Sequence, residues 1–278
     1  MRLENKTAMI VGAGQSPGET VGNGRAVCLL FAREGAALAC VDRSLEAAEE
    51  TAALVRAEGG RAMIYYCAQL GDIVHAANCT EEEKEEADAI MSVLTPIAKA
   101  FLTETGLEAA NHGVQVFGGH GYIQEWGMEQ IVRDTRISTL YEGTTGIQAL
   151  DLIGRKVLAD RGTMLRFWTR IIHRFCRDNE NKKMQEFIKP LRSHYREWGN
   201  FTRKVGMKAM KNRDEVGAAA YDYLMYAGYV SLAYFWAKIA DAAYTCLENG
   251  AEDPDYYQGK IKTARFYYKK LLPRAKMH

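Results

Sequence analysis

A single carboxylate, Glu142, stands where it could act as a base. It precedes Gly143 in the segment 141–146, which interrupts an amphipathic run that starts at Met128. A carboxylate before a glycine, where one helix stops and another starts, can be held at a fixed angle in an apolar cleft, and such a group suits removal of a weakly acidic proton. The same pattern also fits a plain helix end, with Gly143 as the C-terminal cap and Glu142 solvated in the last turn.

A second candidate site is a glycine-rich loop near the N-terminus, GAGQSPGETVGNGRA at residues 12–26. Glycines before a helix let the backbone approach a pyrophosphate, and Asp42, after the next predicted strand, can accept a hydrogen bond from a ribose 2′-hydroxyl. The predicted order is strand, helix, strand, helix over residues 7–11, 24–33, 36–41 and 44–57. The alternative is a scaffold that keeps the nucleotide loop without using it.

This N-terminal segment resembles the opening of short-chain dehydrogenases/reductases. The glycine pattern of that family falls here on Gly12, Gly22 and Gly24, although the loop is about six residues longer, QSPGET. With Asp42 in place, the resemblance implies NAD rather than NADP as the cofactor.

The resemblance to reductases stops near residue 60, where the pattern changes to helical periodicity. Tyr234 and Lys238 match the Tyr-x-x-x-Lys pair of those enzymes by letter. They lie in a long aromatic helical segment with only Ser231 nearby, so we do not expect them to be catalytic.

Three motifs in order resemble the C-terminal helical domain of acyl-CoA dehydrogenases. They are QVFGGHGY at 115–122, RDTRI at 133–137 and YEGTTGIQ at 141–148. The similarity runs from about Met63 to Leu158. EWGMEQ and GIQALDLIGRK are most similar to the branch that acts on methylthiopropanoyl-CoA and related short or medium acyl thioesters.

That resemblance implies a flavin-dependent dehydrogenation of an acyl-CoA thioester. Glu142 would remove the α-proton while the β-hydrogen leaves as hydride to FAD. Gln115, Gly118 and Gly119 would lie along the ADP part of an FAD bound to a neighbouring subunit, and Thr144 would contact the flavin nucleotide. The family relationship also implies a homo-oligomer and an electron-accepting flavoprotein as partner.

The expected fold is mainly α: an acyl-CoA dehydrogenase C-terminal-type helical bundle plus an extra helical module, preceded by a partial Rossmann (βαβα) unit. We expect the boundaries 1–60, 61–158 and 159–278. No counterpart of the family's N-terminal helical and middle β-domains is apparent, so we expect this flavoprotein segment to be incomplete on its own.

Helical periodicity sets the elements of the two C-terminal parts. A first helix is expected over residues 62–78, and a second begins in the acidic run EEEKEEAD and passes Pro96, where it could bend. Breaks are expected near Asn179, Asn212 and residues 252–254. In the last long helix, one face should pack as core rather than bind a ligand; it comprises Tyr223, Tyr226, Val230, Tyr234, Ala237 and Asp241.

Composition indicates an ordinary globular protein, 47% hydrophobic and 26% charged. No apolar run reaches the roughly 20 residues that a membrane span needs. Six scattered cysteines without a C-x-x-C pair are expected to be reduced, buried thiols in a cytoplasmic protein. We expect no metal site at the isolated His112 and His120, and no nucleic-acid binding.

Charge is distributed unevenly along the chain. Residues 1–152 carry 11 Lys and Arg against 22 Asp and Glu, a net charge of −11, whereas residues 153–278 carry +12. Oppositely charged halves attract one another, within a chain or between protomers, and the basic half could also meet an anion such as the phosphates of coenzyme A. Self-association is the use we expect.

Three hypotheses of function remain. The first is an acyl-CoA dehydrogenase-type flavoprotein segment. The second is an NAD-binding module on a helical bundle, without hydride chemistry of its own. The third is a non-catalytic, oligomerising helical protein from a fused or truncated gene.

Overall fold

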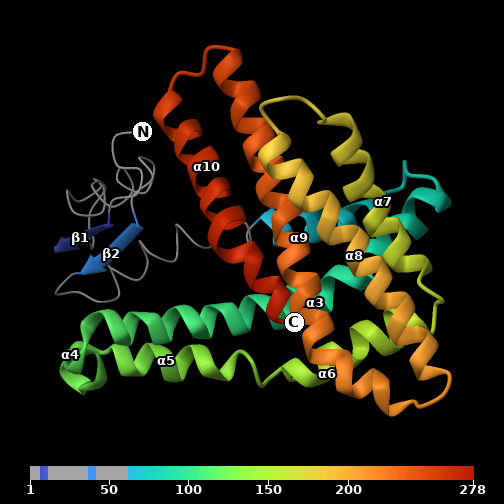
Figure 1. Cartoon of the computed structure of the whole chain (residues 1–278), viewed down its shortest axis with the longest axis horizontal. Coiled ribbons are helices and arrows are strands. Elements are labelled where there is room, and N and C mark those ends of the chain that lie inside the picture. The colour runs from blue at the N-terminus through green and yellow to red at the C-terminus, as the bar shows by residue number, and fades with distance from the viewer. Residues whose placement is uncertain (1–6, 12–36, 42–61) are drawn as a thin grey trace. The chain divides into compact units, whose positions relative to one another are not determined.

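The computed structural model describes residues 7–11, 37–41 and 62–278 (Figure 1). The chain divides into two compact units. Unit 1 comprises Met1–Glu58, Thr103–Ser138 and Lys238–Tyr267, and unit 2 comprises Gly59–Leu102, Thr139–Ala237 and Tyr268–His278. The two units are described separately below.

The N-terminal segment contributes two strands, β1 (Thr7–Val11) and β2 (Ala37–Val41). They pair in parallel, in a register from Thr7↔Ala37 to Val11↔Val41. Both strands were predicted from the sequence. The loop and the two helices predicted beside them lie outside the described residues, so the partial Rossmann unit remains a prediction.

The helix expected over residues 62–78 is present at residues 62–75. The next one, α3 (Glu81–Phe117), continues through Pro96 without a break. It opens with a capping box, in which the Thr80 N–H donates to Glu83 Oε2 over 2.8 Å and the Glu83 N–H donates to Thr80 Oγ1 over 3.3 Å. The acidic first turn therefore also supplies the cap that sets where the helix begins.

The remaining helices follow the predicted breaks. They are α4 (Gly119–Tyr122), α5 (Met128–Ile137), α6 (Thr145–Leu150), α7 (Thr163–Asp178), α8 (Gln185–Ala209), α9 (Asp214–Glu248) and α10 (Pro254–Phe266). Short 3₁₀ segments lie at Gln124–Trp126 (η1) and Leu272–Met277 (η4), and π-helical segments lie at Asp151–Leu158 (η2) and Tyr267–Leu271 (η3). The mainly helical fold is confirmed.

Within unit 2, the core forms around α9. Nearly every side chain from Tyr223 to Ala237 is buried, because this helix is apolar all round and other helices cover all its faces. The predicted packing face is confirmed from Tyr223 to Ala237, whereas Asp241 is half-buried. Trp168 of α7 donates to Ser231 Oγ over 3.2 Å and contacts the ring of Tyr234 edge-on, with 5.0 Å between ring centroids.

The tyrosine of the Tyr-x-x-x-Lys match is part of this packing, whereas Lys238 is exposed. Tyr234 is buried among Trp168, Phe175 and Phe235. Burial raises the pKa of Tyr234, because an apolar environment disfavours the phenolate. A catalytic tyrosine of the reductase type requires the opposite shift, which supports the prediction that this pair is structural.

The four described cysteines are free thiols, but only Cys176 is buried, whereas Cys67, Cys79 and Cys246 are half-buried. The expectation of buried thiols was therefore wrong for these three. Burial raises the pKa of Cys67 and of Cys176 to about 11, so these two thiols stay protonated at neutral pH.

No helix in the described ranges is long and apolar enough to cross a membrane.

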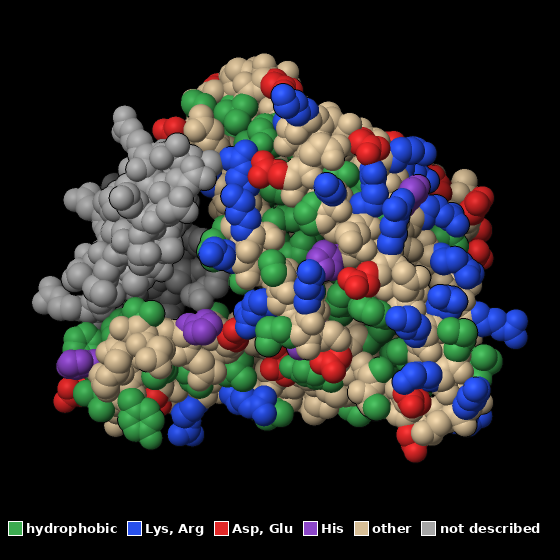
Figure 2. Space-filling view, in the orientation of Figure 1, with side chains coloured by type: hydrophobic (Ala, Val, Ile, Leu, Met, Phe, Trp, Pro, Cys, Tyr) green, Lys and Arg blue, Asp and Glu red, His purple; other side chains and the backbone are tan. Residues whose placement is uncertain are grey.

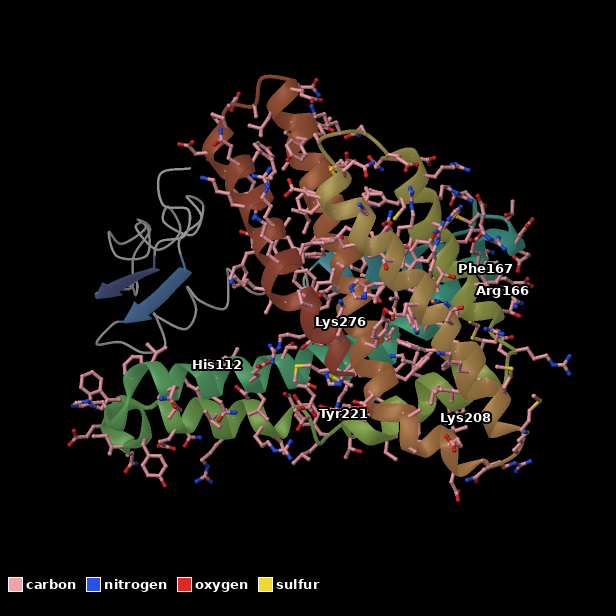
Figure 3. All side chains as sticks on the ribbon, in the orientation of Figure 1. His112, Arg166, Phe167, Lys208, Tyr221 and Lys276 are labelled. Atoms are coloured by element: carbon pink, nitrogen blue, oxygen red, sulfur yellow. The ribbon has the colours of Figure 1, made fainter. Side chains whose placement is uncertain are left out.

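Lys and Arg side chains gather over α7 and α8 in Figure 2. One of them, Arg170, lies over the ring of Phe167 at 5.3 Å from its centroid, and Arg166 is exposed on the same helix (Figure 3). The basic character expected for the C-terminal half is thus a property of this exposed surface.

Candidate active site

Glu142 lies in the connection between α5 and α6, within unit 2. The preceding helix ends at Ile137 with Ser138 as its C-terminal cap, so Gly143 is not the helix cap that the sequence pattern allowed. Glu142 and Gly143 both adopt left-handed backbone conformations, with φ of 56° and 90°. A positive φ is uncommon for a residue with a Cβ, and it marks a turn whose shape the surrounding structure imposes.

Two side chains hold the carbonyl groups of this turn. Gln148 Nε2 donates to the Glu142 carbonyl oxygen over 3.0 Å, and Lys99 Nζ of α3 donates to the Gly143 carbonyl oxygen over 2.5 Å. Thr144 follows as the N-cap of α6, where its Oγ1 accepts from the Ile147 N–H over 3.4 Å. Both carbonyl groups and the helix start therefore have partners.

The side chain of Glu142 is exposed, so the described residues do not form the apolar cleft that the sequence suggested. No described segment of unit 2 covers the turn. Large apolar side chains are exposed close to it in the sequence, with exposed fractions between 45% and 59%: Leu140, Tyr141, Ile147 and Leu150. The carboxylate is therefore exposed, and large apolar side chains are exposed at neighbouring positions in the sequence.

The candidate FAD contacts at Gln115, Gly118 and Gly119 lie in unit 1, where α3 turns into α4. All three residues are exposed. Gly118 has a φ of 59°, and its N–H donates to the Gln115 carbonyl oxygen over 3.2 Å. The structure thus gathers these three residues at one helix end, while Glu142 and Thr144 share a turn of unit 2.

Gly118, Gly119 and Gly121 lie at this helix end, and the structural reason for glycine differs among them. A Cβ on Gly121 would lie 2.6 Å from the Val114 carbonyl oxygen, so packing forces glycine there. A Cβ on Gly118 or Gly119 would meet nothing within 4 Å. Gly118 needs its positive φ, but neither packing nor a positive φ accounts for Gly119. Its backbone is left open to the approach of another molecule.

The two isolated histidines have local partners in unit 1. His112 Nε2 lies 3.5 Å from Glu108 Oε1 one turn earlier in α3, and it is labelled in Figure 3. His120 contacts the Trp126 ring edge-on, with 5.2 Å between centroids. Within the described ranges, no group of three or more His, Cys, Asp or Glu side chains could hold a metal ion.

Sequence reasoning missed two residues of the Glu142 turn, Lys99 and Gln148. Lys99 interrupts an otherwise apolar stretch of α3, between the buried Ile97 and the buried Ala100 and Phe101. A lone cation at such a position needs a hydrogen-bond acceptor, and that signal could have identified it. Gln148 belongs to the YEGTTGIQ motif, but its side-chain partner could not be read from spacing.

The candidate NAD contacts Gly12, Gly22, Gly24 and Asp42 lie outside the described residues. The sequence places Gly12 directly after β1 and Asp42 directly after β2.

Comparison with known proteins identifies the family. The model for the C-terminal domain of acyl-CoA dehydrogenases matches residues 18–158, about half of the chain. The chain belongs to the acyl-CoA dehydrogenase family. A second model, described as acetyl-CoA dehydrogenase C-terminal like, matches residues 168–278. The first match begins inside residues 1–60 and gives no support to the reductase-like opening predicted there.

Relatives of this acyl-CoA dehydrogenase family member are considerably longer. The 3-methylmercaptopropionyl-CoA dehydrogenase of Ruegeria pomeroyi is 33% identical over 219 residues, which cover 77% of this chain and 36% of that protein. The broad-specificity linear acyl-CoA dehydrogenase FadE5 of Mycobacterium tuberculosis is 27% identical over 78% of this chain and 37% of its own length. The chain therefore spans little more than a third of these relatives.

Solved structures agree on the fold. Caenorhabditis elegans ACDH-11 in complex with C11-CoA superimposes with a TM-score of 0.63 at 17% identity, covering 81% of this chain and 35% of that one. The C-terminal helical fold of acyl-CoA dehydrogenases is therefore present in this chain.

Proposed function

We propose that this chain supplies the catalytic base and part of the FAD site for α,β-dehydrogenation of an acyl-CoA thioester. The observation that carries this proposal is the Glu142 turn, in which a carboxylate is presented from a left-handed backbone held at both of its carbonyl groups. A base must be held within hydrogen-bond reach of the proton it removes. Here the backbone that bears it is fixed before any substrate arrives.

Glu142 takes the α-proton of the thioester in this proposal. Its exposed side chain leaves room for a substrate, and Leu140, Tyr141 and Ile147 present an apolar surface beside it. An acyl chain laid on that surface would exclude water from the carboxylate. The backbone N–H of Glu142 would hold the thioester oxygen as enolate charge develops.

The residues present fit FAD as the cofactor. The open backbone at Gly118 and Gly119 admits the ADP part of a dinucleotide next to the exposed Gln115. The Thr144 hydroxyl accepts at the cap of α6 and can still donate to an acceptor on the flavin nucleotide. When bound, FAD supplies a hydride acceptor for the β-hydrogen of the substrate.

We further propose a homo-oligomer in which one subunit's Gln115 segment serves its neighbour's FAD, and a flavoprotein as electron acceptor. Charge complementarity between the acidic residues 1–152 and the basic residues 153–278 supports association of copies. Turnover would also require the domains that the longer relatives carry outside the matched region. The free thiols at the described cysteines support a cytoplasmic location.

The test combines FAD, short and medium acyl-CoA thioesters and a reducible dye. With the domains of the longer relatives supplied by a second polypeptide, we expect dye reduction by the wild-type chain and its loss in Glu142→Gln, which keeps the side-chain shape but removes the base. Glu82→Gln changes an exposed glutamate of α3 and serves as the control. Equal rates in wild type and Glu142→Gln would contradict the proposed role.

A second candidate, NAD binding at the N-terminal segment, is favoured by the parallel pairing of β1 with β2. Parallel neighbours require a crossover connection, and ligands of such units bind beyond the carboxyl ends of the strands, where the sequence places Gly12 and Asp42. Calorimetry with NAD tests this candidate. Saturable heat of binding in the wild type that is lost in Asp42→Ala would support NAD binding. No heat of binding at millimolar NAD would rule it out.

A further inference from the structure

The backbone conformation of the Glu142 turn must be stabilised by residues outside the turn. Glu142 has a φ of 56°, which is unfavourable for a side chain with a Cβ, and Gly143 continues the left-handed path with a φ of 90°. The seven-residue connection 138–144 would relax to a commoner conformation unless its backbone groups were bound.

Lys99 provides a bond of this kind from a distant part of the sequence. Its Nζ donates to the Gly143 carbonyl oxygen over 2.5 Å, across a separation of 44 residues. A hydrogen bond from an ammonium group is shorter and stronger than one between neutral groups. It connects the middle of α3, whose neighbouring side chains Ile97 and Phe101 are buried, to the carbonyl group that follows the base.

Gln148 completes the arrangement from the other side. Its amide donates to the Glu142 carbonyl oxygen, one residue before the acceptor of Lys99. Consecutive carbonyl groups are therefore bound by two side chains from two helices, α6 and α3. With both groups bound, the peptide between Glu142 and Gly143 cannot rotate without breaking a hydrogen bond.

We propose that Lys99 is a positioning residue for Glu142, which it orients by holding the Gly143 carbonyl group. This inference rests on the proposed role of Glu142 as the base. Lys99 does not take part in proton transfer; its ammonium keeps the backbone in the left-handed conformation from which the carboxylate is presented. Any donor that reaches the same carbonyl oxygen should serve in part.

Isotope labelling can observe this hydrogen bond directly. The sequence contains two Gly-Thr pairs, Gly143-Thr144 and Gly162-Thr163. A sample with [1-¹³C]glycine and [¹⁵N]threonine therefore gives two correlations between a carbonyl carbon and the following amide. The second pair precedes α7 and serves as an internal control.

Lys99→Met keeps the length of the side chain and removes the donor. We expect the Gly143 carbonyl resonance to move upfield as its hydrogen bond is lost, while the Gly162 resonance stays in place. Lys99→Arg should bring it back toward the wild-type position. The glutamine side chain of Lys99→Gln is too short to reach the Gly143 carbonyl oxygen, so this variant should shift the resonance as Lys99→Met does. Lys99→Gln is used instead if the Lys99→Met protein fails to fold.

Kinetics then separate positioning from a merely structural role. In protein that turns over, Lys99→Met should lower kcat on the order of 10- to 100-fold with little change in KM, and Lys99→Arg should recover part of the loss. An unmoved Gly143 resonance, or equal movement of both resonances, would overturn the inference. Absence of turnover in the wild type supplied with the domains of the longer relatives would instead contradict the proposed function, and the resonance measurement would still decide whether Lys99 holds the turn.

Discussion

The side-chain amide of Gln148 lies in the space that a Cβ on Gly143 would need, with 2.7 Å between the two positions. The same amide donates to the Glu142 carbonyl oxygen. Glycine at position 143 is therefore required twice, by its φ of 90° and by the side chain packed against it.

Gly143→Ala should consequently destabilise the turn, by about 1–3 kcal/mol, because alanine is strained at this φ and displaces Gln148. Gly146→Ala is the matched control three residues later. Its Cβ would meet nothing within 4 Å, and alanine in a helix is favoured by roughly 0.5–1 kcal/mol. Urea denaturation of both variants measures the difference, and equal stability would show that the turn is not held as described.

Gly119→Ala tests the flavin site without disturbing the fold. Because a Cβ at this position meets nothing in the described structure, we expect the midpoint of thermal unfolding to be unchanged or slightly raised. FAD affinity should fall at least several-fold, since a methyl group would stand where the backbone meets the nucleotide. Fluorescence titration with FAD measures it, and unchanged affinity would remove Gly119 from the site.

A different glycine reports on the core of unit 2. A Cβ on Gly228 of α9 would lie 2.2 Å from the Phe101 ring of α3, so Gly228→Ala should cost about 1–3 kcal/mol through overpacking. Gly217 lies in the same helix with nothing within 4 Å, and Gly217→Ala should be neutral or stabilising. Chemical denaturation compares the two. Equal stability of Gly228→Ala and Gly217→Ala would contradict the close packing of Phe101 in α3 against Gly228 in α9.

Acid should weaken the folded state through His194. This residue is buried in α8, where Nδ1 lies 3.0 Å from the Tyr226 hydroxyl, which also donates to Glu197 Oε2 over 2.8 Å. Burial lowers the pKa of His194, the Glu197 carboxylate opposes that shift, and Lys276 (Figure 3) adds to it.

A histidine whose pKa is lowered by folding binds its proton more readily in the unfolded chain. The free energy of unfolding should therefore fall as the pH drops below about 6.5, the ordinary pKa of histidine, and the contribution should be complete above it. His194→Gln should flatten this slope, whereas His75→Gln, at an exposed histidine, should not. A slope unchanged in His194→Gln would contradict the assignment.

Much of the helical fold was predictable because local signals specify it. The acidic run at Glu81 and Pro254 mark helix starts, and Asn179 and Asn212 lie where helices end. The predicted face of α9 is buried from Tyr223 to Ala237, but the burial of the other faces of this helix was not predicted. The sequence left open whether Glu142 is held in an apolar cleft or exposed, because that depends on which segments pack over the turn.

The same limit applies within the candidate site. The YEGTTGIQ motif predicts roles for Glu142 and Thr144, but the hydrogen-bond partner of the Gly143 carbonyl group is Lys99, in another helix. Contacts between segments far apart in the sequence leave no periodic trace. The open backbone at Gly119 was likewise visible only once its surroundings were known.

We propose that the Gln115–Gly119 segment of one subunit and the Glu142–Thr144 turn of its neighbour contribute to a flavin-dependent dehydrogenase site. The most direct test of this claim is the visible absorption spectrum of the purified protein after incubation with FAD and gel filtration. We predict that flavin absorption co-elutes with the wild-type protein and is diminished in Gly119→Ala. Colourless wild-type protein, folded by circular dichroism and saturated with FAD before filtration, would contradict the claim.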